Sequence, residues 1–86
     1  MTTPKIHETK IKAGEYDLTA QYGDTVLRGR ATRHQKGPWS LITPYPGDNW
    51  YALLSLAECK DMLANKVIYY HQLAEEAAYR RQEYDT

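Results

Sequence analysis

Cysteine is almost absent from this chain, because Cys59 is the only one. A single cysteine excludes an intramolecular disulfide, which is typical of proteins kept in a reducing compartment. Long apolar runs are absent as well, so we expect neither a secretory signal nor a membrane-spanning segment. These absences predict a cytoplasmic protein that does not bind membranes.

Phenylalanine is missing altogether, and eight tyrosines and two tryptophans supply the aromatic side chains. Because Tyr and Trp carry a polar tip, we expect a small core that lies close to the surface or is shared with a partner. Net charge is also zero, which argues against a general coat for nucleic acid. The charge is uneven, however: residues 1–40 hold seven Lys and Arg against four Asp and Glu, and residues 41–86 hold four against seven. The two halves can attract each other within one molecule or drive association between molecules.

Catalytic and metal-binding patterns are missing too. Cys59 and His71 lie on one predicted helix, about 18 Å apart along its axis, which is too far for a nucleophile and its base. One cysteine and three separated histidines (His7, His34 and His71) have no zinc-ligand spacing. The glycines form no phosphate-binding loop. We therefore expect no enzyme, no metal and no cofactor.

What the sequence does have is a clear β-hairpin pattern. Apolar and polar residues alternate from Glu15 to Tyr22, which is the period of a half-buried strand, and Gly23-Asp24 fits a two-residue turn. The turn fixes the register of the next strand, Thr25 to about His34. It pairs Ala20 with Leu27, Leu18 with Gly29 and Tyr16 with Ala31 on an apolar face, and Thr19 with Arg28, Asp17 with Arg30 and Glu15 with Thr32 on a polar face.

Two further strand candidates flank this hairpin. The first, about Lys5 to Lys12, is polar and bears lysines, which is typical of an edge strand. On the other side, Gln35-Lys36-Gly37 fits a three-residue loop with Gly37 in the left-handed conformation. This loop length places Trp39 and Leu41 on the core side, opposite Arg33 and Ala31. A loop of two or four residues would instead put Trp39 on the polar face beside His34.

A proline-rich loop and a short apolar run lead from the strands to a helix. Pro46-Gly47 fits the centre of a type II turn, and Trp50 to Leu54 is the apolar run. Ser55 and Glu58 then form a capping box, in which Glu58 reaches back to the Ser55 amide. Leu54 and Cys59 stand at the two positions of a hydrophobic staple.

The predicted helix runs from about residue 56 to residue 84 and is longer than the strands. Its apolar stripe has spacings of three and four residues and consists of Leu56, Cys59, Leu63, Val67, Tyr70, Ala74 and Ala77. A helix of about 29 residues spans roughly 43 Å, whereas strands of about eight residues span roughly 27 Å. The helix should therefore overhang the sheet, and its overhanging stripe predicts contact with another surface.

These patterns together predict one domain over residues 1–86 of the α+β class. We expect a small antiparallel β-meander of three to four strands within residues 5–54, packed against one long C-terminal α-helix over about 56–84. A small sheet followed by a helix resembles the topology of several DNA-reading domains, including the arm-binding domains of some phage integrases. The resemblance is one of topology alone.

The first candidate site is the polar face of the third strand, with Arg28, Arg30, His34 and Lys36. Arginines bind phosphate bidentately, and Arg28 should contribute more than Arg30, because its opposite neighbour is the neutral Thr19. The alternative is a solvated face in which Asp17 and Arg30 pair internally.

The second candidate site is the aromatic loop, where Tyr45 and Trp50, with Tyr51, could stack on a base or anchor a protein. The alternative is that Trp50 and Tyr51 close one end of the core and leave Tyr45 in solvent. The third candidate is the far end of the helix, where Tyr70, Ala74, Ala77 and Arg81 would form the interface of a two-fold homodimer. A frayed, solvated helix end is the alternative there.

These candidates favour a small non-enzymatic protein-interaction module that binds a macromolecular partner and forms a homodimer. The size, the zero net charge and the lack of a catalytic pattern resemble small accessory or inhibitor proteins of the kind that phages encode. The alternative function is binding of nucleic acid or a small nucleotide through Arg28, Arg30 and His34.

Overall fold

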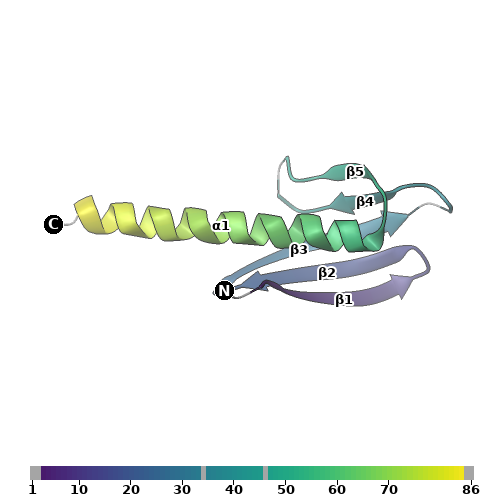
Figure 1. The fold of residues 1–86 in the computed structure, drawn as a ribbon, viewed down its shortest axis with the longest axis horizontal. Helices are drawn as coiled ribbons and strands as arrows, with labels where there is room; N and C mark the ends of the chain where they lie inside the picture. The colour runs from purple at the N-terminus through teal and green to yellow at the C-terminus, as the bar shows by residue number, and fades with distance from the viewer. Residues whose placement is uncertain (1–2, 34, 46, 85–86) are drawn as a thin grey trace.

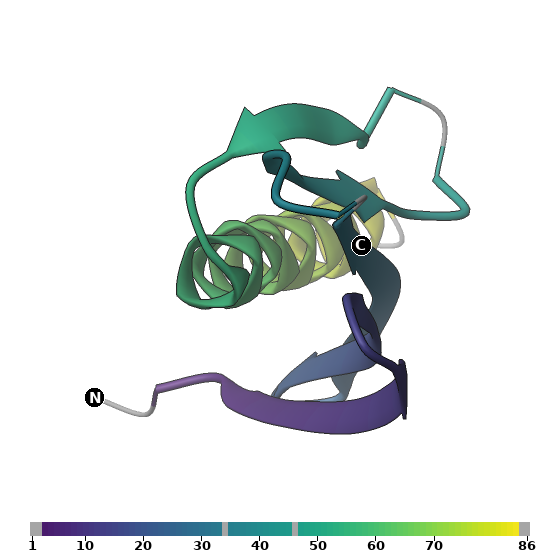
Figure 2. The same cartoon turned by 90° about the vertical axis from the view of Figure 1, so that its right-hand side faces the viewer.

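A computed structural model describes the backbone of residues 3–33, 35–45 and 47–84, and the side chains of these residues as far as Arg80. Five strands precede one helix: β1 (Lys5–Lys12), β2 (Glu15–Tyr22), β3 (Thr25–Arg33), β4 (Trp39–Ile42), β5 (Trp50–Leu53) and α1 (Leu56–Tyr84). The strands form one antiparallel sheet in chain order. Figures 1 and 2 show this sheet curving around one side of α1. The expected α+β meander against a long C-terminal helix is confirmed.

The sheet has one strand more than the expected three to four, because the run after the proline-rich loop forms β5. Leu53 pairs with Trp39 and Trp50 pairs with Leu41, with an irregularity between the two pairs. Ala52 is left-handed there, with φ of 60°. Because of this irregularity, side chains along β5 do not alternate between the two faces of the sheet. The sequence of β5 therefore lacks the period of two that predicts a strand.

The register of the β2–β3 hairpin is as predicted at all six pairs, including Asp17 with Arg30 and Thr19 with Arg28. Gly23 has a φ of 60°, which the two-residue turn requires. A Cβ on Gly23 would lie 2.7 Å from His71 Cε1 of α1, so a side chain there would displace the His71 ring. The turn conformation and the contact with the helix therefore both favour glycine at this position.

The β3–β4 connection places Trp39 as expected, but with a different left-handed residue in its loop. Trp39 pairs with Arg33, Leu41 pairs with Ala31, and both Trp39 and Leu41 are buried. The last pair among the described residues is Arg33 with Trp39. The left-handed residue of the loop is Gln35, with φ of 55°, and not Gly37 as expected.

The core lies between the sheet and the first half of α1. Its buried apolar members are Leu18, Ala20, Leu27, Ala31, Trp39, Leu41, Leu53, Cys59, Leu63 and Val67. Gly29 permits the closest packing, since a Cβ there would lie 3.0 Å from Leu41 Cδ1 and 3.6 Å from Leu63 Cδ1. The helix stripe and the apolar face of the hairpin thus meet as the sequence patterns indicate.

The helix start follows the capping box with one change, and the predicted staple is wrong. The Glu58 amide donates to Ser55 Oγ at 3.1 Å, but the Glu58 carboxylate accepts from the Leu54 amide, at 2.7 Å, instead of the Ser55 amide. Leu54 is 89% exposed, whereas Cys59 is fully buried. Leu53, the last residue of β5, occupies the core in its place, so Leu54 is turned outward.

The second half of α1 extends beyond the sheet (Figure 1), and the molecule measures 57 Å along its longest axis and 24 Å across. We call residues 72–84 the helical extension. Every side chain described in it, from Gln72 to Arg80, is exposed. The predicted overhang is therefore present. Within the described residues, α1 has no stretch long and apolar enough to cross a membrane.

Candidate interaction surfaces

The helical extension continues the stripe that faces the sheet. Cys59, Leu63 and Val67 are fully buried on this stripe, whereas Ala74 and Ala77 at the same helical spacing are exposed. Larger apolar side chains flank the exposed part: Leu73 is 42% exposed and Tyr79 is 63% exposed. The stripe leaves the sheet without changing its spacing, so its second half is a helix face with no partner among the described residues.

His71 fixes the point where the helix leaves the sheet. Its Nδ1 lies 3.1 Å from Thr25 Oγ1, and its ring packs edge-on against Tyr22 at 5.0 Å between centroids. Its Nε2 lies 3.1 Å from the Glu75 carboxylate in the next turn. No local sequence pattern predicts this contact, because Thr25 and His71 are 46 positions apart in the chain.

Tyr70, which we expected in a dimer interface, is engaged within the chain. Its hydroxyl donates to the Asp48 carboxylate, and this hydrogen bond, together with burial, raises the pKa of Tyr70. Asp48 is 8% exposed and its carboxylate also lies 3.5 Å from Lys66 Nζ. These contacts attach the loop between β4 and β5 to α1. The Tyr70 hydroxyl is thus bound within the chain, whereas the interface candidates Ala74 and Ala77 lie on the exposed stripe.

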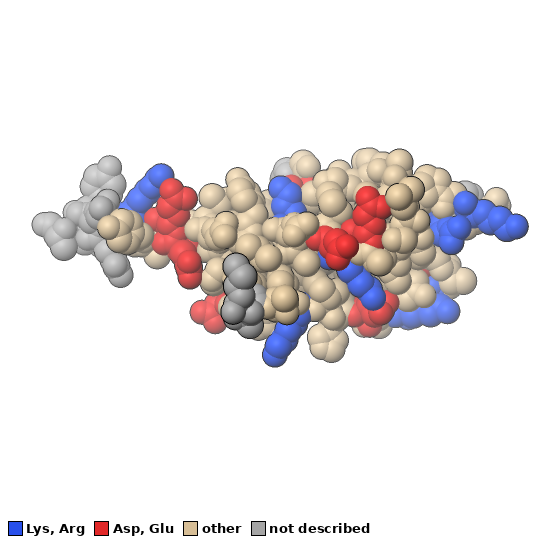
Figure 3. Space-filling model, in the orientation of Figure 1, with Lys and Arg blue, Asp and Glu red and all other residues tan. Residues whose placement is uncertain are grey.

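Acidic and basic residues are ordered along the helical extension, with Glu75 and Glu76 nearer the sheet and Arg80 further from it. Arg80 pairs with Glu76 at 2.9 Å, and Figure 3 shows acidic and basic side chains lying next to each other on this end of the molecule. The side chain of Arg81, the fourth interface candidate, lies outside the described residues.

The basic face of β3 is divided between one paired and one available arginine. Arg30 donates to Asp17 at 2.9 Å and lies 3.3 Å from Glu15, and the hydrogen bond and charge of Asp17 raise its pKa. The internal pairing is thus confirmed. Arg28 has no carboxylate of a described residue within ion-pair distance. Lys36 is exposed in the loop beyond β3, and His34 lies outside the described residues.

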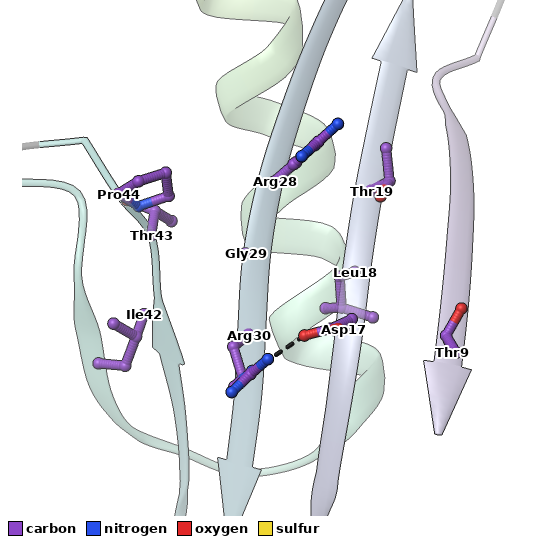
Figure 4. A pocket seen from close by; sticks show the side chains of 10 residues that line it. All are labelled: Thr9, Asp17, Leu18, Thr19, Arg28, Gly29, Arg30, Ile42, Thr43 and Pro44. Atoms are coloured by element: carbon purple, nitrogen blue, oxygen red, sulfur yellow. Dashed lines mark hydrogen bonds and ion pairs between the residues drawn. The ribbon is translucent and has the colours of Figure 1, made fainter. Parts of the chain in front are cut away.

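A depression of about 590 Å³ lies on the sheet face opposite α1 (Figure 4). Arg28 stands at one end and the Arg30–Asp17 pair at the other. Ile42 and Pro44 form one side, and Thr9 and Thr19 lie on the other. The structure therefore brings Arg28 and Arg30 together in one site, with Lys36 outside its lining.

The aromatic loop agrees with its structural alternative at Trp50, which packs against the core, and differs from it at Tyr45 and Tyr51. Tyr45 packs against the core, and its hydroxyl accepts a hydrogen bond from the Arg28 amide at 3.3 Å. Tyr51 is 67% exposed, and Trp50 is half-buried with Lys66 Nζ 5.9 Å from its ring centre. The loop turns as expected at Gly47, with φ of 81° and a 3.2 Å hydrogen bond from the Asp48 amide to the Tyr45 carbonyl. Pro46 lies outside the described residues.

The cysteine and the potential metal ligands of the described residues are placed as follows. Cys59 is buried in the core, and burial followed by the charge of Glu58 raises the pKa of its thiol to about 11. Among the described residues, no three His, Cys, Asp or Glu side chains are grouped to hold a metal ion.

Comparison of the chain with protein-family models, with curated proteins and with solved structures finds no match.

Proposed function

We propose that this chain is a small, non-enzymatic protein-interaction module that binds a macromolecular partner through its helical extension. One observation carries the proposal: α1 keeps its stripe beyond the sheet, but every described side chain from Gln72 to Arg80 is exposed. A helical segment as short as this extension is only marginally stable in water without tertiary contacts. Binding would bury the stripe and stabilise the extension, as suits an accessory or inhibitor protein.

The partner that fits the extension is a second copy of the chain. Two extensions that pair antiparallel about a two-fold axis bring Glu75 and Glu76 of each copy towards Arg80 and Arg81 of the other. Ala77 lies between these charged positions and Ala74 lies just before them on the same stripe, and both small side chains permit close approach of the helix axes. The order of charges along the extension is thus complementary to itself only in the antiparallel arrangement.

Analytical ultracentrifugation of the full chain at micromolar concentration tests the homodimer. We expect about twice the 10.0 kDa chain mass, and Ala77→Arg should give the monomer, because it places a bulky charge in the contact. Asn65→Arg is the control, since Asn65 is exposed on the part of α1 that covers the sheet, and it should leave the dimer intact. A wild type that is monomeric at every accessible concentration would exclude the second copy as partner.

The broader proposal, a protein-binding extension, has its own test. Immobilised wild type, Ala77→Arg and Asn65→Arg are compared for the proteins that they retain from the native cell extract, which are identified by mass spectrometry. A protein retained by wild type and Asn65→Arg but lost with Ala77→Arg supports binding through the extension. Identical retention by all three, together with a monomeric wild type, would refute it.

Binding of nucleic acid across β3 is less well supported. A polyanion needs several cations along its path, whereas Asp17 and Glu15 neutralise Arg30 and Lys36 stands apart in its loop. Of the arginines on this face in the described residues, Arg28 alone has no carboxylate partner. That arrangement suits a small ligand with a single charge better than a nucleic-acid strand.

A further inference from the structure

The depression on the outer face exists because β4 is shorter than β3. β4 pairs with β3 only from Arg30 to Arg33. The part of β3 that precedes Arg30 therefore has no neighbouring strand on that side. Thr43 and Pro44 lead the chain away at this point, and the Tyr45 hydroxyl accepts the hydrogen bond that the Arg28 amide would have given to a strand. The short β4 therefore creates the depression, and the hydrogen bond between Arg28 and Tyr45 stabilises its edge.

Alternation along β3 gives the depression a flat floor with a charged residue at each end. Arg28 and Arg30 face outward, whereas Gly29 between them faces Leu41 and Leu63 in the core, so backbone forms the floor. Figure 4 shows the side chains of Arg28 and Arg30 at opposite ends, with apolar Ile42 and Pro44 on one side. The volume, about 590 Å³, lies within the range of small-molecule sites.

Arg28 is the cation of this floor that has no described carboxylate partner. Two arginines and one aspartate line the depression, but Arg30 is already paired with Asp17 at 2.9 Å and with Glu15 at 3.3 Å. The guanidinium of Arg28 has the donor geometry to bind a carboxylate bidentately. Thr19, its cross-strand neighbour, carries a hydroxyl that can also donate.

We propose that this depression binds a small monocarboxylate with an apolar body, with its carboxylate on Arg28 and its body against Ile42 and Pro44. This site lies on the sheet face opposite α1 and does not depend on the function proposed for the helical extension. The two can therefore succeed or fail separately.

Titration of the ¹⁵N-labelled full chain with benzoate, followed by NMR, tests the site. We expect saturable shifts of the Thr19, Arg28, Gly29 and Ile42 amides with a dissociation constant of about 1 to 10 mM, as suits a ligand of this size. Neutral benzamide should bind at least about tenfold more weakly, because it cannot form the charge-assisted hydrogen bonds.

Two variants with different perturbations assign the binding to named residues. Arg28→Ala should weaken benzoate binding about tenfold or more, and Ile42→Asp should do the same by placing a negative charge on the apolar side. Arg80→Ala removes an equal charge from the helical extension and should bind benzoate as the wild type does.

Three results would each overturn the proposal. The first is the absence of saturable shifts up to about 50 mM benzoate, which exceeds the expected range. The second is a set of shifts that maps away from the depression. The third is wild-type affinity in both Arg28→Ala and Ile42→Asp, with amide spectra that show both variants folded.

Discussion

Removing a leucine from each half of α1 should separate the part of the helix that belongs to the core from the part that does not. Leu63 is fully buried over Gly29 and Leu41, whereas Leu73, on the extension, is 42% exposed. Leu63→Ala removes methyl groups from a space that the sheet backbone cannot fill, which costs about 2 to 5 kcal/mol of unfolding free energy. Leu73→Ala removes the same atoms from a solvated position and should change it by less than about 0.5 kcal/mol.

The difference is large relative to the stability of a domain of this size, which is about 4 to 13 kcal/mol. Urea unfolding followed by tryptophan fluorescence reports it, because Trp39 is buried in the core. A loss of about 3 kcal/mol would also lower Tm by roughly 12 to 24 °C in thermal unfolding. Measurements at dilute and concentrated protein separate intramolecular from dimer contributions. Equal losses for the two variants in dilute solution would refute the reasoning, because they would place the extension inside the folded core.

Two further predictions concern charges in the described structure. Exchanging the charges of the Asp17–Arg30 pair should restore most of the stability that either single substitution, Asp17→Arg or Arg30→Asp, loses, since the two side chains are direct cross-strand partners; additive losses in denaturant titrations would contradict the pairing. The pKa of Cys59 rises from 9.0 to about 11 in the folded chain, so the unfolded chain loses its thiol proton first and stability should fall as pH rises from about 9 towards 11. In Cys59→Ala the unfolding free energy should fall less steeply over that range than in the wild type. An identical pH profile would contradict the burial of Cys59.

The hairpin and the side of Trp39 could be predicted from the sequence because local rules determine both. A two-residue turn at Gly23 leaves one register that keeps Leu18 and Ala20 on the face of Leu27. The pairing of Asp17 with Arg30 follows from the same register. β5 could not be predicted, because the left-handed Ala52 interrupts its alternation. The predicted hydrophobic staple was wrong for a related reason, because the path of β5 decides whether Leu53 or Leu54 enters the core.

The candidate surfaces were predicted only where neighbours in space are also linked by strand register. Arg28, Arg30 and Asp17 lie on paired strands, so the sequence indicates their proximity. Thr43 and Pro44 enter the depression because β4 ends before β3 does, and that length difference is set by the packing of the following loop. The Tyr70 contact with Asp48 likewise depends on where the loop lies against α1. Such contacts have no period or spacing in the sequence.

The change of side-chain size along one stripe of α1 connects the fold to the proposed function. Over the sheet, the stripe carries Cys59, Leu63 and Val67, all fully buried, which fill the space between a helix and a strand layer. On the extension, the same spacing carries Ala74 and Ala77, which favour helix formation without a sheet beneath them. Small side chains also let two helix axes approach towards the short end of the usual 8 to 10 Å range. An antiparallel pair of extensions requires large side chains where the stripe faces the sheet and small side chains where it faces the other helix. Ala77→Arg changes only the second part, so it separates the two roles.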